Sequence, residues 1–184
     1  SFGLSSSSVS RKFKEGSKKV LESFENRLLH NKEFVAIFID GKYMAEQQMV
    51  IVLGVTKDGD KIPLGAIQTT TENSKSIKQL LSDLIERGLS YEKGLLCVID
   101  GSKGIKKAIV EVFGKYAVIQ RCQWHKRENV VSYLPDRDKE CYRKKMQNAY
   151  QKKTYKEAHR ALMKIRTELY VKNRAAAGSL EEGM

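Results

Sequence analysis

Two aspartates stand directly at the ends of two apolar runs, and a glycine follows each of them. Asp40 ends the run FVAIFID at 34–40, and Asp100 ends the run LLCVID at 95–100. Short apolar runs of this kind are typical of buried strands. Carboxylate oxygens at the edge of a sheet suit Mg²⁺, and a pair of such ions can activate a water or a 3′-hydroxyl. We therefore predict that Asp40 and Asp100 are catalytic metal ligands; the alternative is that each Asp-Gly pair only marks a strand-to-loop turn.

A second spacing that could support chemistry is the Cys-x-x-His of Cys122 and His125, within QRCQWHKREN at 120–129. A structural zinc site needs four ligands, and no second pair at zinc spacing is present. A nucleophilic Cys-His pair would need an orienting third group and an oxyanion hole, and the sequence indicates neither. The neighbouring Trp124 is expected in the core rather than as a stacking platform for a base.

The elements that must position these residues follow from hydrophobic periodicity and turn residues. Residues 1–10 are serine-rich and predict a loop, and an irregular helical stripe interrupted by Gly16 follows. The remaining expected elements are strands at 34–40, 49–55 and 62–70, a hairpin turn at 57–61, a helix at 74–88, a strand at 95–100, a helix at 103–113, a strand at 116–120 and helices within 139–169. Three antiparallel strands followed by strands reached through helices predict an α/β fold with a ribonuclease-H-like mixed sheet, and helices after it.

The positive charge of the chain is concentrated in its last third. The formal net charge is +12. Residues 34–120 carry 11 Lys and Arg against 10 Asp and Glu, whereas residues 121–174 carry 16 against 6. A basic block beside a neutral fold favours a phosphate-bearing partner, although a well-solvated lysine-rich helix has the same composition. The candidate phosphate contacts are Arg121, Lys126, Arg127, Arg143, Lys144 and Lys145.

Composition limits the class of protein. A chain of 184 residues, 41% hydrophobic and 30% charged, fits a soluble globular domain, and no stretch is long and apolar enough to span a bilayer. The N-terminus lacks the order of a signal peptide. The odd, scattered cysteines Cys97, Cys122 and Cys141 argue against a disulfide framework and suit a reducing cytosol.

Taken together, these motifs resemble the mutator-type DDE transposases of bacterial insertion sequences. The resemblance covers about residues 34–184. The motifs that carry it are FIDGK around Asp40, LGVTKDGDKIPLG at 53–65, ENS at 72–74, LLSDLIERGL at 80–89, VIDGSKG at 98–104, QRCQWHKREN at 120–129 and AAAGSLEEG at 175–183.

The resemblance implies a DNA transposase that cleaves and joins DNA at insertion-sequence ends, with Mg²⁺ or Mn²⁺ at Asp40 and Asp100. Cys122 and His125 match the family's C-x-x-H signature. The expected partners are transposon-end and target DNA, with no membrane, and a homo-oligomer is plausible for the full-length protein. The expected location is the bacterial cytoplasm, in association with the nucleoid.

The resemblance also implies a domain organisation. Residues 1–31 are expected to be a linker and the remnant of a helix-turn-helix DNA-binding domain, because LSSSSVSR at 4–11 is similar to the end of a recognition helix; a flexible linker alone is the alternative. Residues 32–122 are expected to form the catalytic core with the first two acids. Residues 123–184 are expected to begin a basic helical insertion.

The third acid of the family is a glutamate beyond that insertion, so we expect it beyond Met184. Glu181 and Glu182 match the insertion's own motif, not the catalytic glutamate. Two alternatives stay open: another ribonuclease-H-like nuclease, with its third acid among the remaining glutamates, and a non-catalytic basic DNA-binding remnant. The remaining glutamates after Asp100 are Glu111, Glu128, Glu140, Glu157 and Glu168.

With two of three acids, the chain alone is predicted neither to cleave nor to join DNA. Incubation with Mn²⁺ and a DNA carrying insertion-sequence ends should leave that DNA unchanged on a denaturing gel. Strand transfer by this chain that is abolished by Asp100→Ala would contradict the prediction.

Overall fold

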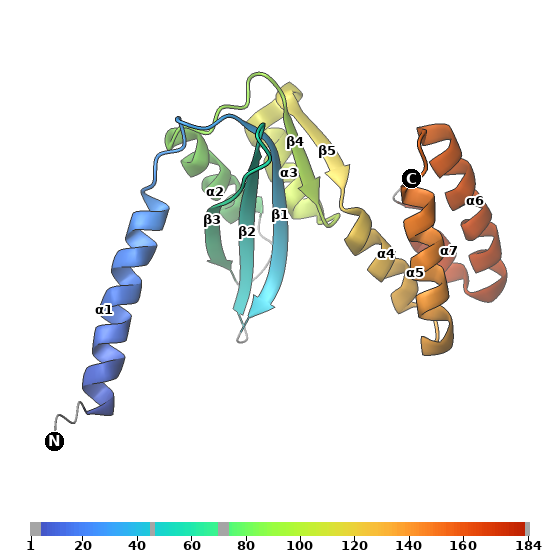
Figure 1. Cartoon of the computed structure of the whole chain (residues 1–184), viewed down its shortest axis with the longest axis horizontal. Coiled ribbons are helices and arrows are strands. Elements are labelled where there is room, and N and C mark those ends of the chain that lie inside the picture. Colours follow the sequence, from blue (N-terminus) through green and yellow to red (C-terminus); the bar gives the residue numbers. More distant parts are fainter. Residues whose placement is uncertain (1–4, 45–46, 70–73, 183–184) are drawn as a thin grey trace. The chain divides into compact units, whose positions relative to one another are not determined.

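The computed structural model describes residues 5–44, 47–69 and 74–182. The chain divides into two compact units, residues 1–120 and residues 121–184. The first holds the sheet and the second is helical (Figure 1). Parts of four predictions lie outside the described residues: the first residue of LSSSSVSR, most of ENS, the last residue of the strand 62–70, and the end of AAAGSLEEG with Met184.

The sheet of the first unit is mixed, as predicted. Its strands are β1 (Phe34–Met44), β2 (Gln47–Thr56), β3 (Lys61–Thr69), β4 (Leu95–Ile99) and β5 (Ala117–Arg121). They lie in the order β3-β2-β1-β4-β5, with β1 antiparallel to β2 and parallel to β4. Three meandering strands followed by strands reached through helical crossovers form the predicted ribonuclease-H-like arrangement (Figure 1).

The meander is specified by a turn and by strict alternation. Gly59 has a φ of 89°, a left-handed conformation that glycine adopts without steric cost, in the predicted turn between β2 and β3. The Thr56 side chain accepts a hydrogen bond from the Asp60 amide at 3.1 Å. Every second residue of β2 is buried, so one face of the strand lies in the core.

Two helices cover that core face. They are α2 (Ser74–Glu86) and α3 (Lys103–Phe113), the latter followed by the short 3₁₀ helix η1 (Gly114–Tyr116). The apolar stripe of α2 is buried as predicted and packs with the inward residues of β1 and β2. Gly88, at φ 100°, ends the helix, and the next amide, of Leu89, returns to the Leu84 carbonyl at 2.9 Å.

The N-terminal segment differs from the prediction. Helix α1 (Ser6–Glu25) is continuous through Gly16 and includes half of the predicted serine-rich loop. The reason is capping, because the Ser5 hydroxyl accepts a hydrogen bond from the Ser8 amide at 3.3 Å and so starts the helix. No residue of α1 is buried.

Hydrogen bonds from two arginines hold the end of α1 to the sheet: Arg27 donates to the Pro63 carbonyl, and Arg87 donates to three carbonyls. The Arg87 guanidinium donates to the carbonyls of Arg27, Leu64 and Phe24, at 2.9, 2.9 and 3.3 Å. These contacts join α1 and the segment after it to the end of α2 and to β3, since Phe24 and Arg27 come from the N-terminal segment and Leu64 from β3.

The second unit has its own core. Its helices are α4 (Gln123–Ser132), α5 (Asp136–Tyr150), α6 (Tyr155–Lys172) and α7 (Arg174–Glu181). Apolar side chains from all four helices form a second buried cluster, separate from that of the sheet. Helices α5 and α6 match the prediction, whereas α4 and α7 carry too few apolar residues to give a clear period in sequence. None of the described helices combines the length and apolar character needed to cross a bilayer.

The packing predicts a steric test of the sheet. A Cβ added at Gly54 would lie 2.7 Å from the Phe34 ring and 2.8 Å from the Leu64 side chain, both of them buried. Gly54→Ala should therefore destabilise the first unit by about 1–3 kcal/mol. Hydrogen exchange at the amides of β1 and β2 during urea unfolding would measure this.

The matched control is Gly16→Ala in α1, where an added Cβ meets nothing within 4 Å. It should stabilise its helix by roughly 0.5–1 kcal/mol, because alanine loses less backbone entropy than glycine. Equal effects of the two substitutions would contradict the packing described for Gly54.

Candidate functional site

The register of two parallel strands brings Asp40 and Asp100 to the same edge of the sheet. In β1 and β4, Ile39 is paired with Ile99 at the last registered position. Asp40 is the next residue of β1, which continues to Met44 instead of ending at the acid as predicted, and Asp100 directly follows β4. The backbones of neighbouring strands lie roughly 4.7–4.9 Å apart. The two acids that the sequence singles out are therefore neighbours in the structure.

Both carboxylates also lie on one face. Side chains alternate along a strand, so Asp40 shares the face of Phe38, and Asp100 continues the face of Val98. Phe38 and Val98 are themselves paired across the two strands. Ile39 and Ile99 point the other way, into the core that α2 and α3 cover. Asp40 and Asp100 are half-buried, at the open face.

The turn after β4 orients Asp100. Its Oδ1 accepts a hydrogen bond from the Ser102 amide at 2.9 Å. Gly101 has a φ of 107°, which a side chain at this position would disfavour. Ser102 then caps α3 by accepting from the Ile105 amide at 3.3 Å. The turn of Gly101 and Ser102 thus fixes Asp100 between the end of β4 and the start of α3.

The two carboxylates are the kind of ligand that a divalent cation prefers, but two protein ligands do not complete the site. Two carboxylates at neighbouring positions of adjacent strands repel each other unless a cation lies between them, and Mg²⁺ accepts one or two protein carboxylates with water and phosphate oxygens. Within 5–44, 47–69 and 74–182, no group of three or more His, Cys, Asp or Glu side chains is placed to hold a metal ion. Glu111, the remaining glutamate candidate in the sheet unit, pairs with Lys78 at 3.2 Å and Lys107 at 3.9 Å.

The C-x-x-H signature lies at the start of α4. Cys122 is its N-cap residue and His125 follows in the first turn. Trp124 is 56% exposed, so the prediction that it belongs to the core is wrong. Trp124 is not a member of the apolar cluster that the helices of this unit bury. The Trp124 and His125 rings meet edge to face, with centroids 4.8 Å apart. All three cysteines are free, in agreement with the sequence.

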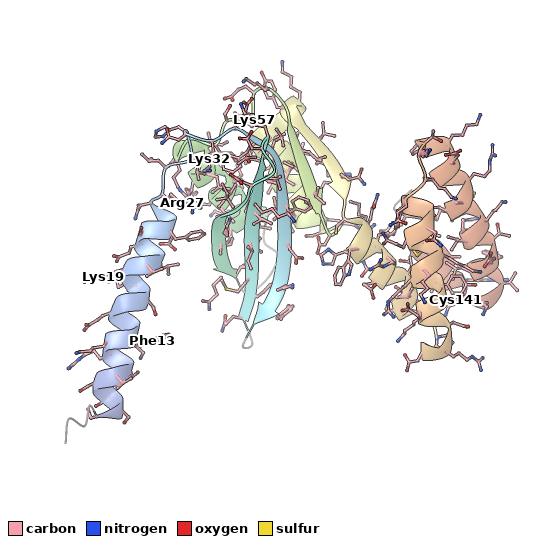
Figure 2. The ribbon with its side chains drawn as sticks, viewed as in Figure 1. Phe13, Lys19, Arg27, Lys32, Lys57 and Cys141 are labelled. Atoms are coloured by element: carbon pink, nitrogen blue, oxygen red, sulfur yellow. The ribbon has the colours of Figure 1, made fainter. Side chains whose placement is uncertain are left out.

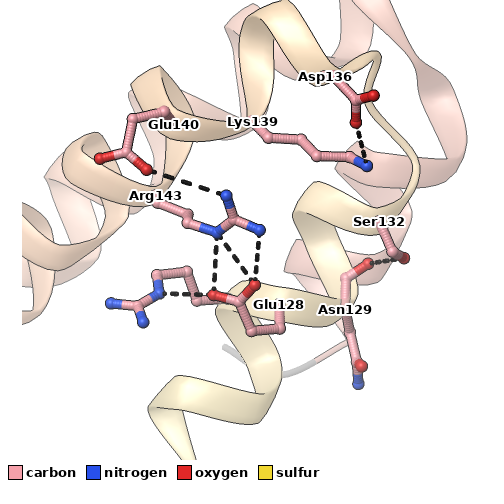
Figure 3. A network of polar contacts seen from close by, with 8 residues as sticks. Glu128, Asn129, Ser132, Asp136, Lys139, Glu140 and Arg143 are labelled. Carbon is pink, nitrogen blue, oxygen red and sulfur yellow. Dashed lines mark hydrogen bonds and ion pairs between the residues drawn. The ribbon is translucent and has the colours of Figure 1, made fainter.

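Most of the predicted phosphate contacts are already paired with acids. The Arg143 Nε donates to Glu128 at 3.2 and 3.0 Å, and its Nη2 lies 2.9 Å from the same carboxylate (Figure 3). Arg127 also donates to Glu128, at 3.2 Å, and to Gln147 at 2.7 Å. The hydrogen bond from Arg143, followed by that from Arg127, holds the pKa of Glu128 below its ordinary value, although burial opposes this.

The two lysines beside Arg143 are paired in the same way. Lys144 lies 3.6 Å from Glu140 and is largely exposed. Lys145 forms a hydrogen-bonded ion pair with Glu168 on α6 and lies over the Tyr142 ring, 5.1 Å from its centroid. The bond to Glu168 raises the pKa of Lys145. The Lys145–Glu168 pair joins α5 to α6, whereas the Lys144–Glu140 pair lies within α5.

Lys126 is not at the surface, which does not suit a direct contact with a phosphate. Only 3% of the residue is exposed, and its Nζ lies 3.8 Å from Glu182, beyond hydrogen-bonding distance. Burial lowers its pKa, the nearby Arg121 lowers it further, and Glu182 opposes both. Arg121 lies 3.5 Å from the same Glu182 carboxylate. One glutamate after α7 therefore faces two cations from the start of the unit.

Comparisons with known proteins identify the family of this chain. The family model described as "Transposase, Mutator family" matches residues 1–184. The chain belongs to the mutator family of transposases. It is 32% identical to the transposase for insertion sequence element IS6120 of Mycolicibacterium smegmatis, over 72% of this chain and 42% of that protein. It is 28% identical to the transposase for IS256 in transposon Tn4001 of Staphylococcus aureus, over 80% of this chain and 40% of that protein.

This transposase chain thus spans about two fifths of the length of the curated relatives it matches. A simian T-cell lymphotropic virus intasome structure aligns with 83% of the chain at 11% identity, with a TM-score of 0.31. A score this low does not establish a shared fold, so the ribonuclease-H-like assignment depends on the strand order itself.

Sequence reasoning missed two supporting residues of this transposase chain. Ser102 both orients Asp100 and caps α3, and a serine placed just before an apolar helical stripe is a recognisable cap signal. Glu182 was assigned only to a family motif. No local pattern indicates that it faces Lys126, because that contact depends on how α7 packs on α4.

The position of Lys126 predicts a non-additive pair of substitutions. Glu182→Gln removes the carboxylate that faces a buried ammonium, and should destabilise the second unit by about 1–2 kcal/mol, a value reduced because Glu182 itself is 68% exposed. Lys126→Met should be close to neutral, and combining it with Glu182→Gln should recover most of the loss. Fluorescence of Trp124, the single tryptophan, during urea unfolding measures each variant.

Glu140→Gln is the control, since this acid is largely exposed and its removal should change little. Additive effects of the substitutions at Glu182 and Lys126 would contradict the electrostatic link between them.

Proposed function

We propose that Asp40 and Asp100 hold Mg²⁺ or Mn²⁺ in a polynucleotidyl transferase site that cleaves DNA and transfers strands at insertion-sequence ends. The observation that carries this is the parallel register of β1 and β4, which makes the two acids neighbours on one open face. Membership of the mutator transposase family supports the DNA substrate.

The chain's own residues prepare the site in separate ways. The β1 backbone holds Asp40 opposite Ile51 in the β2 ladder, so its position is fixed by strands on both sides. The Ser102 amide orients Asp100 through a strand-to-helix turn. A bound pair of divalent ions supplies activation of the attacking oxygen and stabilisation of the leaving oxygen. A third carboxylate is required, and the described residues do not bring one to this edge.

The alternative of a complete nuclease within this chain has little support. Glu111 is engaged by Lys78 and Lys107. Glu128 and Glu168 are each bound by cations of their own helical unit. These three carboxylates already have structural roles, so we favour a third acid supplied from elsewhere in the full-length transposase. Because transposition joins two DNA ends, we also propose that the full-length protein acts as a homo-oligomer.

Metal binding tests the proposal independently of catalysis. Titration of the chain with Mn²⁺, followed by calorimetry or water-proton relaxation, should show weak binding that Asp40→Asn or Asp100→Asn weakens by about tenfold or more, because each substitution removes one of two charged ligands. The double variant should not bind measurably at this site.

Asp58→Asn is the matched control. Asp58, like Asp40 and Asp100, is followed by glycine, but it lies in the exposed hairpin turn between β2 and β3. The affinity of the Asp58→Asn variant for Mn²⁺ should equal that of the unmodified chain. Equal binding by Asp40→Asn, Asp100→Asn and Asp58→Asn would overturn the assignment of the two acids.

A further inference from the structure

A second group of cations, outside the predicted phosphate contacts, surrounds the turn between α5 and α6. All of its members are exposed and lie within thirteen residues of one another. They are Lys152, Lys153, Lys156, Arg160 and Lys164. We call this set the α5–α6 cationic turn; it lies wholly within the second unit. Figures 1 and 2 show the helices α5 and α6 that the turn connects.

These cations differ from the earlier candidates in their pairing. Arg127, Arg143, Lys144 and Lys145 each face a glutamate within 4 Å. No member of the cationic turn forms an ion pair or a side-chain hydrogen bond with any residue in the described part of the chain. Most cations of α5 are therefore engaged by acids, whereas the cations of this turn form a group whose charge is available to an external anion.

The cations also surround a hollow. A surface depression of about 520 Å³ is lined by Gln151, Lys152, Lys153, Glu157, Arg160, Ala161 and Lys164. Four of these seven residues are cationic and one is acidic, so the lining attracts anions. Lys156, Arg160 and Lys164 recur every four residues and so form one row along α6.

The first turn of α6 adds to this potential and offers a ring. Thr154 caps the helix, and the positive end of the 18-residue helix dipole lies beside Lys152, Lys153 and Lys156. Tyr155 is 80% exposed, with its ring 5.7 Å from that of His159. Exposed aromatic rings between cations are typical of surfaces that bind nucleic acids, because bases can stack on them. Such rings would not strengthen the binding of a partner that is recognised only by its charge.

We propose that the α5–α6 cationic turn is a docking surface for the phosphodiester backbone of DNA. The proposal rests on the proposed function, since that function identifies DNA as the polyanion. It places the main phosphate contacts of the helical unit at Lys152, Lys153, Lys156, Arg160 and Lys164. Arg127, Arg143 and Lys145 then serve chiefly to hold the helices together. Contacts of this kind are independent of DNA sequence.

Fluorescence anisotropy with a labelled duplex of arbitrary sequence, measured over a range of salt concentrations, tests the proposal. The variant with Lys153→Gln, Arg160→Gln and Lys164→Gln should bind at least about tenfold more weakly at low salt. The slope of log K against log salt should decrease in magnitude by roughly 2–3, about 0.9 for each lost phosphate contact. Circular dichroism should be unchanged, because all three side chains are exposed.

Two control variants distinguish the effect of clustered cations on DNA affinity from the effect of total charge. Lys61→Gln, Lys106→Gln and Lys115→Gln together remove the same charge from scattered exposed positions of the first unit, and should lower affinity much less. Lys153→Arg, Arg160→Lys and Lys164→Arg together keep the charge, and should keep the affinity.

Equal losses from the clustered and the scattered variants would overturn the docking surface, as would loss of affinity for an acidic polypeptide but not for DNA. The proposed Mn²⁺ site at Asp40 and Asp100 includes no residue of the α5–α6 cationic turn. Failure of the docking surface is therefore distinguishable from failure of the proposed function.

Discussion

The parallel pairing of β1 with β4 is the constraint on which the rest of the site depends. It places two carboxylates side by side, one within β1 and one directly after β4, an arrangement that is unfavourable without a cation. The antiparallel meander of β1 to β3 buries one face of β1, and α2 and α3 close that face. The acids are thereby confined to the open face. The Ser102 amide then fixes the carboxylate that lies outside the strand ladder.

Charge in the second unit is divided between structure and recognition. Glu128, Glu168 and Glu182 each bind cations that come from other parts of the helical unit, so a basic sequence can still pack into a compact four-helix core. This intramolecular pairing leaves the exposed cations of the α5–α6 turn without acidic partners among the described residues. A basic composition therefore identifies the class of ligand, whereas the pairing identifies which surface is available to it.

Much of the first unit could be predicted from sequence, because its signals are local. The sheet and its covering helix follow from apolar runs, from the Asp58-Gly59 turn and from the apolar stripe of α2. The same apolar runs indicated Asp40 and Asp100 as candidate site residues. The errors occur where non-local packing or capping decides the structure. Ser5 extends α1 into a segment of loop-like composition, and Trp124 is exposed instead of lying in the core of its unit. The burial of Lys126 against Glu182, 56 positions away along the sequence, has no signal in the local pattern.

The central claim is that Asp40 and Asp100 share a divalent metal. Crystals of this chain soaked in Mn²⁺, with diffraction data collected at a wavelength where manganese scatters anomalously, test it most directly. The account predicts anomalous density within coordination distance of both carboxylates, and its loss in Asp100→Asn crystals. Density elsewhere on the molecule, with none between these two residues at saturating Mn²⁺, would contradict it.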